Sequence, residues 1–397
     1  MPLKLSRRLL EMQEAAGVAL ADRVRRMQDS GRTVIALGTG DPDFTTPASI
    51  MRTAFDAMQR GETHYANSRG LPVLRQAIAD SLRRGGVEYG PASEILVTCG
   101  GIHAYACALQ AILEPEGEVL VPDPTWMTHF NLVTVCGGNP VRVPARPENG
   151  FWPLLEDWER AVSPRTVALV LNSPSNPTGA VATREYLERV NQFAAARNLY
   201  VISDEVYDHI LYDGRQHTCF AALPGARSRC LLINSFSKTY AMTGWRIGYL
   251  AGPAEVVSQA LKASQHSITN VAPFVQRAAA FALTDAEVQQ EVSRMAAAYA
   301  RRRDSVLRIW REFGATPVRA DAPQGAFYFF LDVRQLGRPS EEIAESLLEE
   351  ASVATVPGSV YGEGGEGFLR MTSAASDEDV QNGFRGLLKW AAQQSRK

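Results

Sequence analysis

The stretch SFSKTYAMTGWRIGY, residues 235–249, follows a run of apolar residues, RCLLIN, that predicts a buried strand. It places Lys238 beside two serines, Ser235 and Ser237, and eight positions before Arg246. A surface lysine needs no such neighbours, because water solvates its ammonium group. The stretch therefore indicates a polar site just beyond the end of a buried strand.

Similar apolar runs recur through the middle of the chain and alternate with helix-like segments. These runs are EILVTC, EVLVPD, TVALVLN, LYVISD, RCLLIN and IGYLAG. Short runs of this kind predict an α/β fold, with a mostly parallel sheet covered by helices on both faces. From about residue 285 a long charged helix leads to two short strands, GAFYFFLDV and GFLRMTS. We expect a large domain at 46–285 and a smaller α+β domain made of 1–45 with 286–397.

The residues that follow the predicted strands carry groups that can bind a ligand, such as hydroxyls, an indole, a carboxylate and an amine. In an open α/β sheet, ligands bind beyond the carboxyl ends of the strands. The groups expected there belong to Gly100, Gly101, Trp126, Asn176, Asp204, Tyr207, Ser235, Ser237 and Lys238. A helix N-terminus and hydroxyls suit a phosphate, an indole suits a flat ring, and an amine suits an aldehyde. The set predicts a site for pyridoxal 5′-phosphate.

Composition and charge argue against several other classes of protein. The 41 Lys and Arg nearly balance the 43 Asp and Glu, so we expect no nucleic-acid or membrane-surface partner. No apolar run reaches the roughly 18 residues of a membrane span. The N-terminal MPLKLSRRLLEMQEAAG lacks the apolar core of a secretory signal and predicts an amphipathic helix. Five cysteines without a C-x-x-C pair predict reduced thiols, a cytoplasmic location and no metal site.

Several segments, in order along nearly the whole chain, carry a resemblance to a known family. They are GDPDFTTP, THYANSRGLPVLRQAIA, NSPSNPTGAV, ISDEVYDHILYDG, SFSKTYAMTGWRIGYLAGP, PQGAFYFF and VATVPGSVYG with GFLRMT. With these segments the chain resembles the class I aminotransferases of the fold type I pyridoxal-phosphate enzymes, and is similar to the aspartate and aromatic aminotransferase group. The resemblance implies transfer of an amino group between an L-amino acid and a 2-oxo acid.

The resemblance also implies roles for individual residues. Those expected to be catalytic are Lys238, which binds the cofactor as a Schiff base, Asp204 and Tyr207. Those expected to hold the cofactor are Gly101, Ile102, Trp126, Asn176, Asp204, Tyr207, Ser235, Ser237, Lys238 and Arg246. Tyr65 is expected to reach the phosphate of a neighbouring subunit, which implies a homodimer with shared active sites. Those expected to bind substrate are Gly40, Trp126, Asn176 and Arg370, the last on the α-carboxylate.

One departure from the family bears on the substrate. Aspartate-acting relatives commonly have a lysine directly after the glycine pair, where this chain has Ile102. A carboxylate buried against isoleucine would lack a partner, so we expect dicarboxylic amino acids to be poor donors. Apolar, aromatic or other uncharged side chains should be better, and a basic donor stays open. The histidines form no metal-ligand pattern, and His103, beside the glycine pair, is expected to be structural.

Two alternatives remain at the level of sequence. The first keeps the fold and the cofactor but changes the reaction, as in C–S lyases, cyclopropane-forming synthases and oxidative biosynthetic enzymes. They use the same lysine and aspartate, so the motifs do not separate them. The second is a non-enzymatic ligand-sensing domain of a transcription regulator. Such proteins carry an N-terminal DNA-binding module, and the residues before Gly38 leave little room for one.

Overall fold

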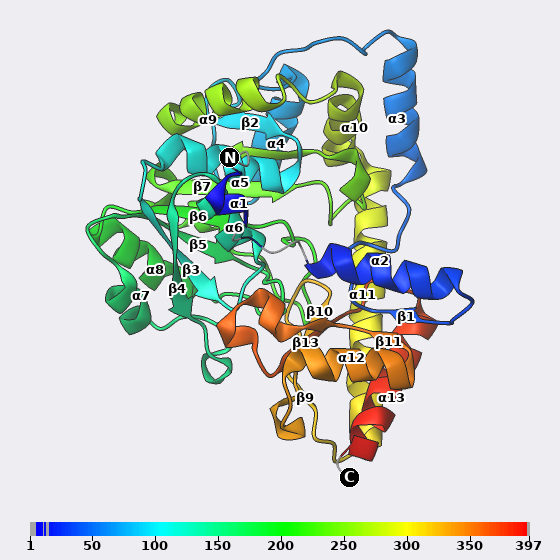
Figure 1. Cartoon of the computed structure of the whole chain (residues 1–397). Coiled ribbons are helices and arrows are strands. Elements are labelled where there is room, and N and C mark those ends of the chain that lie inside the picture. The colour runs from blue at the N-terminus through cyan, green and yellow to red at the C-terminus, as the bar shows by residue number, and fades with distance from the viewer. Residues whose placement is uncertain (1–4, 11, 13–15, 395–397) are drawn as a thin grey trace.

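The computed structural model describes residues 5–10, 12 and 16–394 (Figure 1). The predicted N-terminal amphipathic helix lies partly outside these residues, and its described part contains only the short helix α1 (Arg7–Leu10) before α2 (Ala16–Asp29). Within the described residues, no helix is long and apolar enough to cross a membrane.

A seven-stranded sheet forms the centre of the larger part of the molecule, in the order β2-β8-β7-β6-β5-β3-β4. Its strands are β2 (Ile95–Thr98), β3 (Glu118–Asp123), β4 (Asn139–Pro144), β5 (Thr166–Asn172), β6 (Tyr200–Asp204), β7 (Cys230–Ser235) and β8 (Gly248–Ala251). Only β8 runs antiparallel to its neighbours, so the prediction of a mostly parallel sheet is confirmed. The sequence did not predict β4, whose two prolines are tolerated because it lies at an edge of the sheet.

Helices cover both faces of this sheet, as Figure 1 shows. One face packs against α5 (Gly100–Ile112), α6 (Thr128–Val135) and α9 (Ala254–Ser267). The other packs against α4 (Pro72–Arg84), α7 (Leu155–Ala161), α8 (Arg184–Ala196) and α10 (Pro273–Thr284), with α3 (Ala48–Gln59) against α10. Side chains alternate along each strand, so Leu96 joins the first core while Ile95 and Val97 join the second. This is why the strands are apolar throughout.

The smaller part of the molecule contains a four-stranded antiparallel sheet in the order β12-β13-β10-β9. Its strands are β9 (Arg319–Ala320), β10 (Tyr328–Asp332), β12 (Val356–Pro357) and β13 (Phe368–Thr372). Around it lie α2, α11 (Ala286–Phe313), α12 (Ser340–Ala351), α13 (Asp377–Gln394) and the short helices η6 (Gly358–Tyr361) and η7 (Glu363–Gly365). The long charged helix and the two strands after it were predicted from the sequence.

The N-terminal segment joins the smaller part through a strand pair. β1 (Ile35–Ala36) runs parallel to β11 (Val353–Ala354), and Leu37 lies in the hydrophobic cluster formed by β10, β13 and α13. A fourth cluster, around Tyr207 and Tyr299, lies where the two parts meet. We propose that the domains are 46–285 and 1–45 with 286–397, a division that this pairing and the separate clusters support.

Candidate active site

A cavity of about 1200 Å³ lies at the carboxyl ends of the parallel strands, between the two parts of the molecule. Because β2, β3, β5, β6 and β7 all run in one direction, the residues that follow them meet at one edge of the sheet. The predicted site residues that line this cavity are Gly40, Gly101, Ile102, Trp126, Asn176, Asp204, Tyr207, Ser235, Ser237, Lys238, Arg246 and Arg370. Tyr65 is not among them, and its side chain is 87% exposed.

Lys238 is in the turn that follows β7, and its amine points into the cavity. The Nζ donates to the carbonyl of Gly40 at 2.5 Å. Burial lowers the pKa of Lys238 to about 8, because the charged amine is removed from water, while Asp41 partly opposes the shift. A substantial fraction of this amine is therefore neutral near pH 8, which is the form that attacks a carbonyl carbon or accepts a proton.

The start of α5 forms a cradle for an anion. Gly100 has a φ of +80°, and a Cβ there would lie 2.6 Å from Nη2 of Arg246, so only glycine lets the guanidinium approach. Gly101 lies against Ser235, and Gly101 and Ile102 line the cavity in the first turn of α5, whose N–H groups have no partner within the helix. Ser237 and the cavity-exposed Arg246 add further donors. A helix N-terminus with these donors suits a phosphate.

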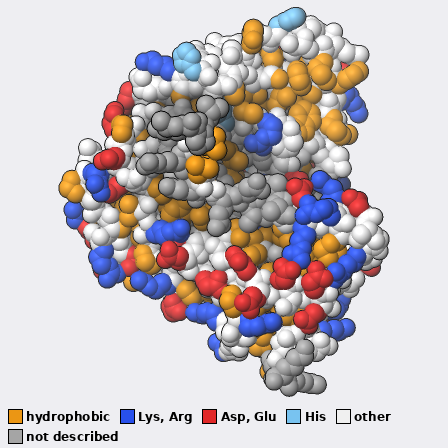
Figure 2. Space-filling view, viewed as in Figure 1, with side chains coloured by type: hydrophobic (Ala, Val, Ile, Leu, Met, Phe, Trp, Pro, Cys, Tyr) orange, Lys and Arg blue, Asp and Glu red, His pale blue; other side chains and the backbone are white. Residues whose placement is uncertain are grey.

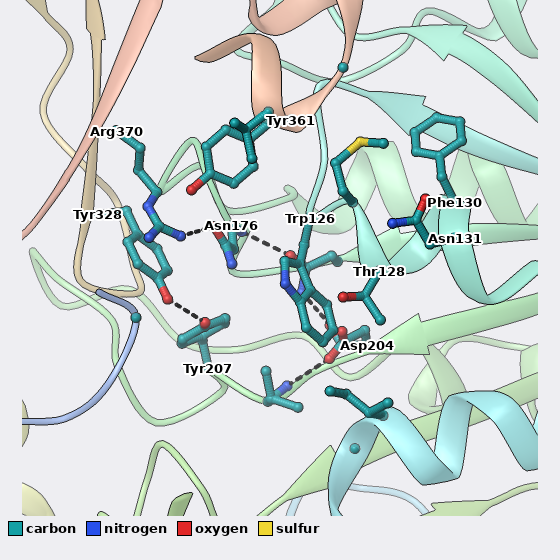
Figure 3. Close-up of a pocket in the computed structure, with 18 of the residues that line it drawn as sticks. Trp126, Thr128, Phe130, Asn131, Asn176, Asp204, Tyr207, Tyr328, Tyr361 and Arg370 are labelled. Carbon is teal, nitrogen blue, oxygen red and sulfur yellow. Dashed lines mark hydrogen bonds between the residues drawn. The ribbon is translucent and has the colours of Figure 1, made fainter. Parts of the chain in front are cut away.

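Asp204 is at the end of β6 and is buried, with 5% of its surface exposed. Its Oδ2 accepts a hydrogen bond from Nε2 of His129 at 2.9 Å, and His129 Nδ1 lies 3.0 Å from the Thr125 hydroxyl. The edge of His129 also faces the Trp126 ring, with the two planes at 85°. This chain of contacts fixes the carboxylate beside the ring that lines the cavity (Figure 3). We use the name cofactor wall for Asp204, His129 and Trp126 together with Lys238 and the anion cradle.

The sequence reading missed His129. It found no pattern among the histidines because the partner of His129, Asp204, lies 75 residues away along the chain. One signal was present, since Thr125 and His129 are four residues apart around the start of a helix that follows a strand. His103, expected to be structural, accepts a hydrogen bond from the Cys99 N–H and contacts the Ser267 hydroxyl.

Two tyrosines meet at the bottom of the cavity. The hydroxyls of Tyr207 and Tyr328 are 2.8 Å apart, with Tyr328 coming from β10 (Figure 3). Burial raises the pKa of Tyr207 above its ordinary value, so its phenol stays protonated and acts as a donor. Tyr328 was not predicted, although it lies in the PQGAFYFF segment, because its contact with Tyr207 joins residues 121 positions apart.

Arg370, from β13, lines the same cavity next to Tyr328 and is 5% exposed. It donates to the Asn176 side-chain oxygen at 3.0 Å and to the Gly38 carbonyl at 2.6 Å. Its guanidinium lies over the rings of Tyr328 and Tyr361, at 4.5 and 5.2 Å from their centroids. We call this group the carboxylate pocket.

The Arg370 guanidinium does not have a full set of hydrogen-bond and charge partners among the described residues. Among the described residues no carboxylate pairs with it, and its buried Nε has no hydrogen-bond partner. A buried cation without a counter-charge is costly, so the pocket is suited to an anion. A planar guanidinium favours a carboxylate, which it can bind through two parallel hydrogen bonds.

The groups around the cavity fit pyridoxal 5′-phosphate as the sequence predicted. The anion cradle could hold the phosphate, Trp126 could stack on the ring, and Asp204 could hold a proton on the ring nitrogen. Asn176 and Tyr207 could bond the ring oxygen, and Lys238 could bind the aldehyde. The fold and this donor set together define a pyridoxal-phosphate enzyme of fold type I.

Comparison with known proteins identifies the family. A family model described as aminotransferase class I and II matches residues 32–387. An aspartate aminotransferase of Pyrococcus abyssi is 39% identical over 384 residues, 96% of this chain and 98% of that protein. An aromatic-amino-acid aminotransferase of Thermococcus litoralis is 38% identical, over 94% of this chain and 98% of that protein. The chain belongs to the class I and II aminotransferases and is a pyridoxal-phosphate-dependent enzyme.

A solved structure agrees with this assignment. The aspartate aminotransferase from Thermus thermophilus with maleate has a TM-score of 0.92 and 38% sequence identity. The match covers 98% of this chain and 100% of that structure. These comparisons give no support to a lyase, a synthase, an oxidative enzyme or a ligand-sensing domain.

Proposed function

We propose that this aminotransferase acts on an L-amino acid with an uncharged side chain, and that the cofactor wall and the carboxylate pocket bind different molecules. The cofactor wall holds pyridoxal 5′-phosphate, and the carboxylate pocket holds the α-carboxylate of the amino acid. The observation that carries the proposal is Arg370, a buried guanidinium without a counter-charge in the described chain. Its distance from Lys238 is spanned by one continuous cavity.

The bound cofactor supplies an electron sink for the charge that forms when the substrate Cα loses its proton. Lys238 would bind the aldehyde of the cofactor, and its neutral amine would be the group that accepts the substrate Cα proton. Its pKa of about 8 supports this role. Asp204, oriented by His129, would keep the ring nitrogen protonated, and Tyr207 would donate to the ring oxygen.

Arg370 orients the substrate as well as binding it. Two fixed hydrogen bonds, to Asn176 and Gly38, leave the free edge of the guanidinium to meet a carboxylate. A carboxylate held at that point would orient the substrate in the cavity that Lys238 also lines. Orientation of this kind lowers the barrier because the reacting atoms no longer have to find each other.

The choice of an uncharged donor depends on Ile102, which lines the cavity where aspartate-acting relatives commonly have lysine. Arg142 also lines the cavity, but it is paired with Asp123 at 2.9 Å and so is partly neutralised. Named relatives act on aspartate or on aromatic amino acids, so both classes are reasonable to test. Because Ile102 is uncharged and Arg142 is already paired, these residues favour aromatic and aliphatic donors over aspartate.

A homodimer and a reducing, cytoplasmic location complete the proposal. Tyr65 is almost fully exposed, so its phenol is accessible to a second subunit. Hydrophobic side chains gather at the upper right of Figure 2, over α3, where Met51, Phe55 and Met58 are exposed. Both features support contact with a second subunit. Cys99, Cys107, Cys219 and Cys230 form no disulfide, which supports a reducing compartment.

The test is a half-reaction followed by absorbance. Purified holoenzyme is mixed with one amino acid and no acceptor, and the cofactor is expected to convert fully to pyridoxamine phosphate. Addition of a 2-oxo acid should restore the original spectrum, with mass spectrometry identifying both products. Product release without conversion of the cofactor would show a different reaction.

A further inference from the structure

The last residue of β3, Asp123, ties the central sheet to the glycine-rich turn 358–365. Its side chain is buried, with 5% exposed. Its Oδ1 accepts a hydrogen bond from the Gly364 N–H at 3.0 Å, and its Oδ2 accepts one from Arg142 at 2.9 Å. The Asp123 carboxylate, in the central sheet, therefore binds the backbone N–H of a residue that lies 241 positions later in the chain.

The turn is packed onto this carboxylate without free space. Gly362 has a φ of +120°, and a Cβ there would overlap Asp123 and lie 2.8 Å from Nη1 of Arg142. A Cβ on Gly364 would lie 2.6 Å from the Asp123 carbonyl oxygen. Both positions need glycine because the backbone itself contacts the end of β3.

A second contact runs beside the first. The N–H of Thr125 donates to the Tyr361 carbonyl at 2.9 Å. We call this bond, with the Asp123 bonds to Gly364 and Arg142, the β3 clasp. One side of the clasp continues into Trp126, on the cofactor wall. The other side carries the Tyr361 ring, which packs against Arg370 in the carboxylate pocket.

We propose that Asp123 is a positioning residue for the substrate carboxylate. By fixing the turn on the end of β3, it sets the distance between Trp126 and the Tyr361–Arg370 pair. A bound amino acid must reach both at once, since its amine meets the cofactor and its carboxylate meets Arg370. The inference rests on the proposed role of Arg370 as the carboxylate anchor.

The alternative is that Asp123 only stabilises the fold, and the chain offers a matched control for that. Asp157 is also a buried carboxylate, 3% exposed, and it binds two arginines, Arg146 and Arg160. It lies in α7 and is not part of the cavity wall. Asp157→Asn should cost stability of a similar kind without moving the carboxylate pocket.

The experiment compares Asp123→Asn, Asp157→Asn and Arg370→Gln as holoenzymes. Asp123→Asn is expected to raise KM for the amino donor about tenfold, with kcat and cofactor affinity within about twofold of the parent. Affinity for a non-reacting carboxylate, read from the cofactor absorbance, should weaken to the same degree. Asp157→Asn should lower Tm but leave KM unchanged.

The possible results separate the two proposals. If KM rises in Arg370→Gln but not in Asp123→Asn, the clasp has no positioning role and the proposed function stands. If KM is unchanged in Arg370→Gln, the anchor itself is wrong and the inference falls with it. An equal rise in KM in Asp123→Asn and Asp157→Asn would overturn the inference, because general destabilisation would then explain it.

A second pair of variants keeps the test valid if Asp123→Asn does not fold. Gly362→Ala places a methyl group against Asp123, whereas Gly337→Ala meets no atom within 4 Å and has a φ of +65°. Gly362→Ala is expected to raise KM for the donor while Gly337→Ala is not. Equal KM values in the two variants would contradict the proposal.

Discussion

The two groups of residues that line the active-site cavity, the cofactor wall and the carboxylate pocket, are built in different ways. On the cofactor wall, most groups lie at or shortly after the carboxyl end of a strand of one sheet, so a short local sequence determines their place. The carboxylate pocket is assembled from three distant segments, because Arg370 binds Asn176 and Gly38, which are 194 and 332 residues away along the chain. In the proposed function the cofactor is held by groups at the edge of the sheet, whereas the substrate carboxylate is held where the two parts of the molecule meet.

The largest effect that would test this contrast comes from Lys238. Lys238→Ala removes both the covalent link to the cofactor and the proton acceptor, so turnover should fall on the order of 10⁴-fold or more. The phosphate contacts remain, so the variant should still bind the cofactor non-covalently. Lys262→Ala is the matched control, because that amine is exposed and donates to the Gln259 side chain, away from the cavity.

A chemical trap gives an independent reading of the same residue. Borohydride reduction should attach the cofactor to one peptide, and the candidate sites are few: Lys4, Lys238, Lys262, Lys389 and Lys397. Because burial lowers the pKa of Lys238 to about 8, attachment to the apoprotein should speed up as pH rises toward that value and level off above it. A label on any other peptide would refute the assignment.

The difference between the cofactor wall and the carboxylate pocket also explains which site residues could be predicted from the sequence. Strands of one direction bring their carboxyl ends to one edge, so Asp204 and Lys238 could be placed together from apolar runs alone. Nothing local in β13 marks Arg370 as different from any charged residue in a strand. Its role was available only through the resemblance of the GFLRMT segment to the family.

The groups that the sequence reading missed are those that depend on tertiary contacts. His129, Tyr328 and Asp123 each act through a partner from a different element, at separations of 75, 121 and 241 residues. The edge strand β4 was also missed, because its prolines at 140 and 144 are typical of turns. The pairing that makes it a strand is with β3, which only the folded sheet provides.

A smaller effect is expected from Tyr65, which would extend the cofactor wall across a subunit interface. Tyr65→Phe removes one hydroxyl that would bond the phosphate of the neighbour, and should weaken cofactor affinity about tenfold. Dilution of the parent enzyme to monomer should reduce activity and cofactor binding together, measured by sedimentation at assay concentration. A fully active monomer would show that one chain completes its own site.

The smallest effect concerns Ile102, where the cofactor wall meets the substrate side chain. Its side chain is 42% exposed, so a charge placed there stays partly solvated and its effect is reduced. We expect aspartate to be a poorer donor than phenylalanine, methionine or leucine with a common acceptor. Ile102→Lys should raise the ratio of kcat/KM for aspartate to that for leucine about fivefold, while Ile102→Met should leave it unchanged.

Ile102→Met separates charge from shape in that comparison, since methionine is close to isoleucine in volume and carries no charge. Arginine belongs in the same panel, because a basic donor would meet no lysine at position 102. If aspartate were the best donor of the parent enzyme by about tenfold, about 1.4 kcal/mol of transition-state preference, the argument from Ile102 would be wrong. The cation responsible would then have to come from elsewhere, and Arg142→Met would test the one that already lines the cavity.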